Sequence, residues 1–418
     1  MKKVSFLQMR CGLLGERLGH SHSPLIHGEL ADYSYSLCEV EKDALADFMK
    51  NGALDAFNVT IPYKQAVIPY LDEISEKAAR IGAVNAVVRQ SDGRLFGYNT
   101  DYFGFEYMLG LLGVHVGGKK ALILGRGGAA LTVRAVLSDK GAREVVMLGS
   151  ADNTPEGIKA HSDAEIIVNA TPVGMYPKNG ASPVELSAFP LCSAVLDLIF
   201  NPARTALLIE AEHLGIPAIN GLPMLVAQAA KAFEFFTGDV CEAGAIERIT
   251  AKIEKATSNI ILVGMPASGK SSIGKIIADK LGRRFVDADE EFEQMHGITP
   301  ARCIEEFGEP HFRALETQTL SELGKLCGAV IATGGGAVTK EENYAHLHQN
   351  GEIFFIERAL TSLSDDGRPL SQRTAREEMY AKRLPMYRRF ADATVYNDTT
   401  AEDAADRVIA EFDKIHDK

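Results

Sequence analysis

The sequence lacks the features typical of membrane-spanning, disulfide-stabilised and nucleic-acid-binding proteins. No stretch approaches the roughly 20 apolar residues that a membrane-spanning helix needs, and its six cysteines contain no C-x-x-C pair. Reduced, mostly buried thiols are therefore expected. The net charge is −12, which argues against a nucleic acid or an anionic membrane surface as the main partner.

The amino terminus also lacks the apolar segment of a secretory signal. Although the chain begins Met1-Lys2-Lys3, Gln8 and Arg10 interrupt the apolar residues that follow. The sequence therefore predicts a cytoplasmic protein, either a monomer or a homodimer. Its 418 residues suffice for about three domains, and no internal repeat or low-complexity tract stands out.

A glycine-rich loop past the middle of the chain carries the strongest signal. Residues 260–263 predict a buried strand, G-x-x-x-x-G-K-S follows from Gly264 to Ser271, and a helical pattern comes next. This order is typical of a phosphate-binding loop, in which backbone N–H groups and the helix dipole hold phosphate oxygens. Lys270 is expected to reach the outer phosphates and Ser271 to bind Mg²⁺. The expected nucleotide contacts are Gly264, Ala267, Ser268, Gly269, Lys270, Ser271 and Ser272.

A second glycine turn lies in the first half of the chain. Residues 120–124 predict a strand, and a G-x-G-x-x-A turn and a helix follow, which favours a dinucleotide pyrophosphate site. Strands expected at 144–148, 164–170 and 194–199 alternate with helices and predict a parallel, doubly wound sheet. The expected cofactor contacts in the turn are Gly125, Arg126, Gly127, Gly128 and Ala129.

The strand after this turn ends without the acidic residue that binds the ribose 2′-hydroxyl of NAD in such sites. The position reads Leu148-Gly149-Ser150, and it offers no cation for the 2′-phosphate of NADP either. Arg126, inside the turn, is the nearest candidate for a 2′-phosphate contact. We hypothesise that it takes this role.

Other segments predict the elements around the two turns. Asp92-Gly93 signals a hairpin, and Ser23 is placed to cap a helix over 25–30. Residues 257–259 are expected to form a hinge before the P-loop strand. Further strands are expected at 3–7, 55–61 and 83–89, and further helices at 102–112, 221–236 and 239–255.

Polar motifs along residues 1–250 match one known family. They are S-x-S at 21–23, N-V-T-x-P-x-K at 58–64, A-V-N at 83–85, N-T-D at 99–101, N-A-T at 169–171 and V-A-Q-A-A at 226–230. On these motifs the region resembles shikimate dehydrogenase. The resemblance implies a substrate-binding α/β domain, a Rossmann NAD(P)-binding domain and NADPH-dependent reduction of 3-dehydroshikimate at its C3 ketone.

The same resemblance implies roles for individual residues. Lys64 and Asp101 are the implied catalytic pair, since the alkoxide left by hydride transfer needs a positioned proton donor. Phe200 stands where the family's D-x-x-Y-N-P motif has tyrosine, which removes one hydroxyl from the substrate side. Ser21 and Ser23 are implied for the substrate carboxylate, Thr60, Asn85, Asp101 and Gln228 for its hydroxyls, and Thr171 for the cofactor.

Charged motifs after the phosphate-binding loop form a second set. Asp287 and Asp289 alternate along an expected strand, so one face carries both carboxylates, one for a Mg²⁺-bound water and one for a substrate hydroxyl. Arg313 and Glu316 stand about one helical turn apart. Another strand ends in glycines at 334–336, which lets the backbone approach a ligand closely.

Two later motifs, R-P-L at 368–370 and R-x-P-x-Y at 383–387, place arginines suited to carboxylate or phosphate beside prolines. With D-x-D, F-R-x-x-E and T-G-G-G, they make residues 259–418 resemble shikimate kinase. The resemblance implies a P-loop domain like those of nucleoside monophosphate kinases, and ATP-dependent phosphorylation of the shikimate 3-hydroxyl.

The kinase resemblance again implies roles. Asp289 binds the hydroxyl and takes its proton, and Lys270 and Arg368 stabilise the transferring phosphoryl group. Arg368 also contacts the nucleotide. Arg313, Arg383, Gly335 and Gly336 are implied for the substrate carboxylate, and Ser271 and Asp287 for Mg²⁺.

The predicted organisation is three α/β domains. Residues 1–102 form a substrate-binding domain completed by helices at 220–255, residues 103–219 a Rossmann domain, and residues 258–418 a kinase domain. The favoured function is a bifunctional enzyme that binds 3-dehydroshikimate, shikimate, NADP(H), ATP and Mg²⁺. One alternative is a shikimate kinase whose first half binds substrate without redox activity. Another is a metabolite sensor, which the intact Lys64, Asp101, Lys270 and Asp289 disfavour.

Overall fold

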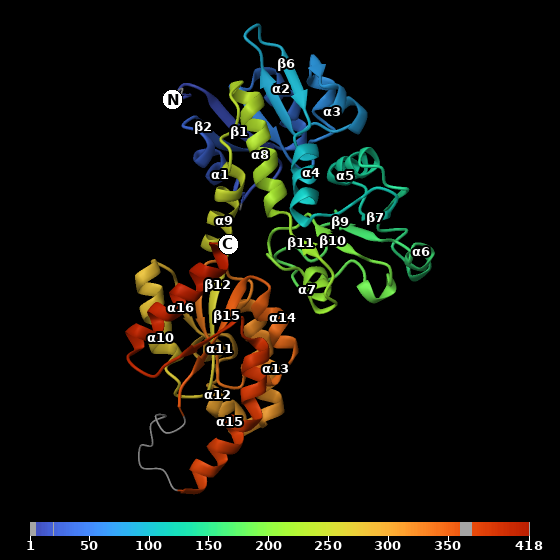
Figure 1. The fold of residues 1–418 in the computed structure, drawn as a ribbon. Helices are drawn as coiled ribbons and strands as arrows, with labels where there is room; N and C mark the ends of the chain where they lie inside the picture. Colours follow the sequence, from blue (N-terminus) through green and yellow to red (C-terminus); the bar gives the residue numbers. More distant parts are fainter. Residues whose placement is uncertain (1–5, 20, 360–369, 418) are drawn as a thin grey trace. The chain divides into compact units, whose positions relative to one another are not determined.

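The computed structural model describes residues 6–19, 21–359 and 370–417, and the chain forms two compact units (Figure 1). Unit 1 comprises Met1–Val173, Ser182–Phe200 and Glu210–Thr250, and unit 2 comprises Gly174–Ala181, Asn201–Ile209 and Ala251–Lys418. The described residues form two sheets in unit 1 and one in unit 2, which confirms the α/β class. The three domain boundaries expected from the sequence stay predictions.

The first sheet of unit 1 is mixed, with the order β2-β1-β3-β5-β6-β4. The pairs β3–β5 and β5–β6 are antiparallel, and the others are parallel. Gly93, at φ +89°, forms the predicted hairpin turn between β5 and β6. The strands are β1 (Arg10–Gly15), β2 (Ser34–Glu39), β3 (Ala56–Val59), β4 (Glu73–Ile74), β5 (Ala86–Arg89) and β6 (Leu95–Tyr98). The helices between them are α1 (Ser23–Leu30), η1 (Lys42–Ala44), α2 (Leu45–Asn51), η2 (Ile68–Tyr70) and α3 (Glu76–Ile81).

The second sheet of unit 1 is parallel, as predicted, with the order β11-β10-β9-β7-β8. Its strands are β7 (Lys120–Leu124), β8 (Glu144–Leu148), β9 (Ile166–Asn169), β10 (Ala194–Asp197) and β11 (Ala218–Ile219). The helices along this part of the chain are α4 (Asp101–Leu112), α5 (Gly128–Asp139), α6 (Pro155–Ala160), η3 (Leu186–Ala188), α7 (Ala206–His213), α8 (Leu222–Thr237) and α9 (Ala245–Thr257). Residues of α7 and of α9 are shared between the two units.

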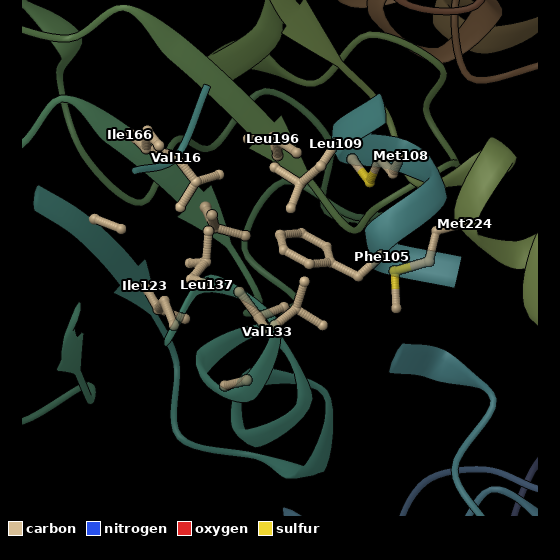
Figure 2. Close-up of a cluster of buried hydrophobic side chains, with 14 of the residues drawn as sticks. Phe105, Met108, Leu109, Val116, Ile123, Val133, Leu137, Ile166, Leu196 and Met224 are labelled. Atoms are coloured by element: carbon tan, nitrogen blue, oxygen red, sulfur yellow. The ribbon is translucent and has the colours of Figure 1, made fainter. Parts of the chain in front are cut away.

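A buried apolar cluster holds α4 and α5 against this second sheet. Phe105 of α4 and Val133 of α5 are both 0% exposed, and they pack with Leu196 of β10 (Figure 2). Burial of such side chains stabilises by roughly 1.5–3 kcal/mol each. The cluster therefore fixes the start of α4, where Asp101 lies, relative to the glycine turn between β7 and α5.

The sheet of unit 2 is parallel, with the order β13-β14-β12-β15-β16. Its strands are β12 (Asn259–Val263), β13 (Phe285–Asp287), β14 (Val330–Ala332), β15 (Gly351–Glu357) and β16 (Ala393–Tyr396). The helices are α10 (Lys270–Leu281), α11 (Ala288–His296), α12 (Pro300–Phe307), α13 (Glu309–Leu323), η4 (Ala337–Thr339), α14 (Glu342–His348), α15 (Leu370–Phe390) and α16 (Ala401–His416).

Three expected elements differ from the structure. Of the strand expected at 3–7, residues 3–5 lie outside the described residues, Phe6 and Leu7 are in no strand, and the first strand that the structure describes is Arg10–Gly15. Helix α9, in which the chain passes from unit 1 to unit 2, begins at Ala245 rather than at 239. The expected hinge is wrong, because only Ser258 separates α9 from β12.

Asn259 shows why the hinge prediction failed. Its side chain is 0% exposed, donates a hydrogen bond to the Leu326 carbonyl at 2.6 Å and accepts one from the Ala329 N–H at 2.8 Å. A buried amide with both groups satisfied belongs to a sheet rather than to a linker.

Among the described residues, no helix combines the length and apolar character needed to cross a membrane.

Candidate active sites

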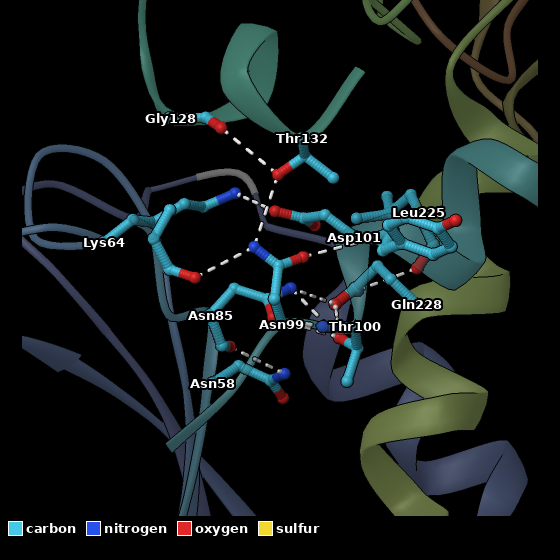
Figure 3. Close-up of polar contacts among 12 residues, drawn as sticks. Asn58, Lys64, Asn85, Asn99, Thr100, Asp101, Gly128, Thr132, Leu225 and Gln228 are labelled. Atoms are coloured by element: carbon cyan, nitrogen blue, oxygen red, sulfur yellow. Dashed lines mark hydrogen bonds and ion pairs between the residues drawn. The ribbon is translucent and has the colours of Figure 1, made fainter. Parts of the chain in front are cut away.

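A lysine and an aspartate from distant parts of unit 1 form a short ion pair. Lys64 lies in the turn after β3, and Asp101 is the first residue of α4. Lys64 Nζ donates a hydrogen bond to Asp101 Oδ2 at 2.6 Å, and the two side chains are 17% and 7% exposed (Figure 3). The structure therefore brings together the two residues of the expected catalytic pair and holds the ammonium in place.

Two of the expected substrate contacts meet through Thr100, the neighbour of Asp101. The Thr100 N–H donates to Asn85 Oδ1 at 2.6 Å, and Asn85 Nδ2 donates to Thr100 Oγ1 at 3.0 Å. Asn85 Nδ2 also lies 3.4 Å from Gln228 Oε1, whose own amide donates to the Leu225 carbonyl (Figure 3). These bonds fix the orientation of both amides beside the ion pair.

The glycine turn adjoins the same ion pair. A Cβ placed on Gly128 would lie 3.6 Å from Lys64 Cβ, so the start of α5 packs against Lys64. Thr132 Oγ1 donates to the Gly128 carbonyl at 3.2 Å and accepts from Asn99 Nδ2 at 3.2 Å (Figure 3). Asn99 thus connects the dinucleotide turn to the segment that carries Asp101.

The two serines of the S-x-S motif contact each other. Ser21 Oγ donates to Ser23 Oγ at 3.1 Å and accepts from the Ser23 N–H at 3.2 Å. Ser23 is the first residue of α1 and His22 is its N-cap, so the expectation that Ser23 caps this helix is wrong. Ser21 supplies the capping bond instead. Thr60 follows β3, and its N–H donates to the Leu14 carbonyl at 2.9 Å.

Phe200, the residue that departs from the tyrosine of the motif, packs on this serine segment. Its ring centroid lies 5.6 Å from that of His22. Phe200 therefore keeps the aromatic ring of the motif's tyrosine beside His22 but lacks its hydroxyl. Burial lowers the pKa of His22, so the imidazole facing Phe200 is neutral at pH 7.

The glycine turn itself has the shape of a phosphate cradle. Gly125 has φ +120°, and a Cβ there would lie 2.8 Å from the Ala170 carbonyl, whereas a Cβ at Gly127 would meet nothing within 4 Å. Thr171, at the end of β9, lies beside Gly125 and donates from its Oγ1 to Asn169 Oδ1 at 2.7 Å. Ala129 follows in the first turn of α5. Arg126 lies 2.5 Å from Asp152 as an ion pair.

In unit 2, the phosphate-binding loop surrounds the head of Lys270. Gly264 and Gly269 have φ +153° and +96°, which favours glycine at both positions. Lys270 Nζ donates to the carbonyls of Gly264 and Met265 at 3.0 and 2.9 Å. Burial lowers the Lys270 pKa to about 8, although Asp289 and Asp287 oppose the shift.

The rest of the loop is arranged around this lysine. Ala267 adopts φ +63°, and Ser268 is 1% exposed with an Oγ that has no hydrogen-bond partner among the described residues. Ser272 is exposed in the first turn of α10. Left-handed backbone at a non-glycine residue and an unsatisfied buried hydroxyl both indicate a loop shaped for a ligand.

The two aspartates of D-x-D lie on different elements. Asp287 ends β13 and accepts from Ser271 Oγ at 2.7 Å, whereas Asp289 is inside α11. Alternation along one strand was therefore the wrong reason for their proximity. Asp287 caps α11 by accepting from the Asp289 N–H at 3.0 Å. Burial, with a further contribution from Asp287, raises the Asp289 pKa, and Lys270 and Arg313 oppose this.

Arg313 and Arg383 each contact the glycine segment that follows β14. Arg313 Nη1 lies 2.7 Å from Glu316 Oε2, one turn along α13 as predicted, and a Cβ on Gly336 would clash with this guanidinium at 2.2 Å. Arg383 Nη1 donates to the Gly335 carbonyl at 3.1 Å. The two arginines and two glycines expected at the substrate carboxylate therefore lie together. Arg368 and the segment before it fall outside the described residues.

Known protein families match three segments of the chain. Residues 13–87 match the shikimate dehydrogenase substrate binding domain, and residues 221–249 match the shikimate 5′-dehydrogenase C-terminal domain. Residues 266–413 match shikimate kinase. The shikimate dehydrogenase (NADP(+)) of Halothermothrix orenii is 39% identical over 261 residues, covering 54% of this chain and 90% of that protein.

The chain belongs to the shikimate dehydrogenase family. Beyond this part it carries a shikimate kinase domain. The counterpart of Clostridium beijerinckii is 37% identical over 245 residues, covering 54% of this chain and 90% of that relative.

Solved structures align with the dehydrogenase part. A chorismate mutase/shikimate 5-dehydrogenase fusion protein from Clostridium acetobutylicum has 37% identity and a TM-score of 0.55, covering 59% of this chain and 97% of that one. Shikimate 5-dehydrogenase of Thermus thermophilus, in complex with NADP(H) and shikimate, has 34% identity and a TM-score of 0.53, covering 58% of this chain and 99% of that one.

The residues of the present chain fit the dinucleotide, the nucleotide phosphates and the Mg²⁺ ion that the two families imply. Open space at Gly127 and the close approach at Gly125 suit a dinucleotide pyrophosphate. The unsatisfied Ser268 hydroxyl suits a phosphate oxygen. Among the described residues, no group of three His, Cys, Asp or Glu side chains could hold a metal. The oxygens of Ser271 and Asp287 suit Mg²⁺, which takes its other ligands from water and phosphate.

Sequence reasoning missed residues that hold Asn85 in place by hydrogen bonds. Tyr35 Oη donates to Asn58 Oδ1 at 2.8 Å, and Asn58 Nδ2 donates to the Asn85 carbonyl at 3.3 Å. Asn58, Asn99 and Thr100 all belong to motifs quoted for the family, so the motifs themselves were the available signal. Tyr35 has none, because its contact with Asn58 depends on β2 and β3 pairing with opposite edges of β1.

Proposed function

We propose that the chain is a bifunctional enzyme that reduces 3-dehydroshikimate to shikimate with NADPH and then phosphorylates shikimate to shikimate 3-phosphate with ATP. The observation that carries the first activity is the Lys64–Asp101 ion pair beside the glycine turn. The second rests on Lys270 and Ser271 of the phosphate-binding loop, with Asp287 at the end of β13 bonded to Ser271 and Asp289 close by in α11.

The reduction needs a proton donor at a fixed position. NADPH, when bound, supplies the hydride to the ketone carbon and leaves as NADP⁺. The ketone oxygen then carries negative charge, and the Lys64 ammonium donates a proton to it. Asp101, 2.6 Å from Lys64 Nζ, orients this ammonium and stabilises its charge before the transfer. A water molecule returns the proton to Lys64 after the product leaves.

The polar residues around the pair position the substrate. Ser21 and Ser23 present hydroxyls for its carboxylate, and Asn85 and Gln228 present amides for its hydroxyls. These amides already have backbone or side-chain partners, so their orientation costs little when substrate binds. Thr60 joins them from the turn after β3.

The phosphoryl transfer needs a base and positive charge. Asp289 accepts the proton of the shikimate 3-hydroxyl, and its raised pKa favours this. ATP with Mg²⁺, when bound, supplies the γ-phosphoryl group, and Ser271 and Asp287 hold the metal. Lys270 stabilises charge on the phosphate oxygens, and Arg313 and Arg383 bind the carboxylate next to Gly335 and Gly336. Arg368 is proposed as a further cation.

The alternative of a redox-inactive first half is not favoured, because both members of the Lys64–Asp101 pair are present and in contact. The cytoplasmic location and the monomeric or homodimeric state stay predictions. Both proposed reactions use small polar molecules.

Paired variants test the two activities in one protein. Lys64→Met and Asp101→Asn should lower dehydrogenase kcat by about 10²–10⁴-fold and leave phosphorylation of added shikimate unchanged. Asp289→Asn should lower the kcat of phosphorylation and leave the reduction unchanged. NADPH absorbance measures the reduction and ADP release measures the phosphorylation. Unchanged phosphorylation by the Lys64 and Asp101 variants, and unchanged reduction by the Asp289 variant, shows that each variant is folded. Absence of turnover in the wild-type chain with both nicotinamide cofactors would reject the dehydrogenase assignment.

A further inference from the structure

An arginine and an aspartate meet at the end of β8, where Rossmann sites receive the adenosine ribose of the dinucleotide. Arg126 Nη2 lies 2.5 Å from Asp152 Oδ2, and their side chains are 61% and 42% exposed. The Gly149 N–H donates to Asp152 Oδ2 at 3.4 Å, and the Asp152 N–H donates to the Gly149 carbonyl at 3.0 Å. Asp152 is thereby folded back over the end of the strand.

Gly149 makes this arrangement possible. A Cβ there would lie 3.1 Å from Cδ and 3.2 Å from Nε of Arg126, so the arginine stem crosses directly over Gly149. The Gly125 N–H also donates to the Leu148 carbonyl at 2.7 Å, which ties the glycine turn to the same strand end. The turn and the β8 end therefore form one surface that carries a cation and an anion side by side.

The two charges have opposite preferences for the cofactor. A carboxylate at this position accepts a hydrogen bond from the ribose 2′-hydroxyl of NADH, whereas a cation attracts the 2′-phosphate of NADPH. A phosphate monoester carries about −1.5 to −2 charges at pH 7. Asp152 repels that charge, and it also occupies the guanidinium that would bind it.

We propose that Asp152 is a specificity-determining residue that weakens the preference of the dehydrogenase for NADPH over NADH. It does so by holding Arg126 in an ion pair and by offering a carboxylate to the 2′-hydroxyl. Arg126 supplies what preference for NADPH remains. The proposal rests on the proposed dehydrogenase function but concerns cofactor discrimination alone.

The test compares Asp152→Asn, Arg126→Met and the double variant in the full chain. Asp152→Asn keeps the size of the side chain and an oxygen for the Gly149 N–H, and Arg126→Met keeps an unbranched stem over Gly149. Glu156→Gln is the matched control, since it removes a negative charge from the exposed start of α6 without touching the Arg126–Asp152 pair. Two quantities are measured: the ratio of kcat/KM for NADPH to that for NADH, and the dissociation constants of both reduced cofactors, titrated by their own fluorescence.

Asp152→Asn should raise both the kinetic ratio and the binding ratio in favour of NADPH by about tenfold, because one repulsive charge near the 2′-phosphate is removed. Arg126→Met should lower both by about tenfold and flatten the salt dependence of NADPH binding. In the double variant, the effect of Asp152→Asn should shrink, since no arginine remains to be released.

A change smaller than twofold in Asp152→Asn, or one equal to that of Glu156→Gln, would overturn the proposal. The binding ratio keeps this outcome separate from failure of the proposed function. If neither cofactor supports turnover but the binding ratio shifts as expected, Asp152 sets cofactor preference and the dehydrogenase assignment fails. If the enzyme turns over and both ratios stay constant, the Asp152 proposal fails alone.

Discussion

Lys270 is a buried cation among the expected catalytic residues. The residue is 8% exposed, its ammonium donates to two loop carbonyls, and burial lowers its pKa from 10.5 to about 8. Phosphate oxygens favour the charged ammonium. Nucleotide binding must therefore raise this pKa again, and binding and protonation of Lys270 are linked.

This linkage predicts proton uptake on nucleotide binding. Below about pH 8 the ammonium is already formed, so affinity should be constant there and fall by up to tenfold per pH unit above it. Calorimetry of a non-hydrolysable ATP analogue with Mg²⁺, in buffers of different ionisation enthalpy, should show proton uptake growing between pH 7 and pH 9. Lys270→Arg, which stays protonated, serves as the control. A wild-type affinity that stays constant up to pH 9 would contradict the account.

At the residue scale, motifs predicted which side chains gather but not how they are held. Lys64 and Asp101 could be paired from two family motifs, and Arg313 and Glu316 from helical spacing. Asp287 and Asp289 were expected on one strand, yet the chain turns into α11 between them. The Arg126–Asp152 pair depends on a loop folding back over Gly149, which no local pattern signals.

At the element scale, the glycines of α4 have different surroundings. A Cβ on Gly104 would lie 2.7 Å from the Met224 carbonyl of α8, whereas a Cβ on Gly110 would meet nothing within 4 Å. Gly104 therefore permits the close approach of α4 and α8, which carry Asp101 and Gln228. Gly110 only weakens the helix.

Alanine substitution should consequently act in opposite directions at these two positions. Gly104→Ala should destabilise unit 1 by about 1–3 kcal/mol through overpacking against backbone, and Gly110→Ala should stabilise it by up to about 1 kcal/mol. Thermal inactivation of the dehydrogenase measures both changes, and kinase activity after the same heating reports on unit 2. Shifts of the same sign in both variants would show that the α4–α8 approach is not what requires Gly104.

Glycine also explains why the sequence did not predict β1, the first strand that the structure describes. The C-G-L-L-G segment contains two glycines, which disfavour a strand by local propensity. In the structure a Cβ on Gly12 would lie 2.7 Å from the Ser36 carbonyl, and one on Gly15 would lie 2.8 Å from a Thr60 methyl carbon. Both glycines mark close approaches within the sheet. Tertiary packing, which the sequence alone does not display, overrode the local preference.

At the scale of the whole molecule, one chain carries two sets of residues for consecutive reactions on one oxygen atom. Unit 1 holds Lys64 and Asp101, the proposed catalytic pair of the reduction that leaves a hydroxyl at C3. Unit 2 holds Asp289 and Lys270, which we propose to act in the phosphorylation of that hydroxyl. The parallel sheets and their glycine loops could be predicted, because apolar strands followed by glycine and a helix are strong local signals.

The most direct test supplies the wild-type chain with 3-dehydroshikimate, NADPH, ATP and Mg²⁺ and follows all products together. The account predicts that one NADPH is oxidised and one ADP released for each shikimate 3-phosphate formed. Lys64→Met should stop both signals, and added shikimate should restore ADP release. Phosphorylation of added shikimate without oxidation of NADPH or NADH, at any concentration of 3-dehydroshikimate, would contradict the account.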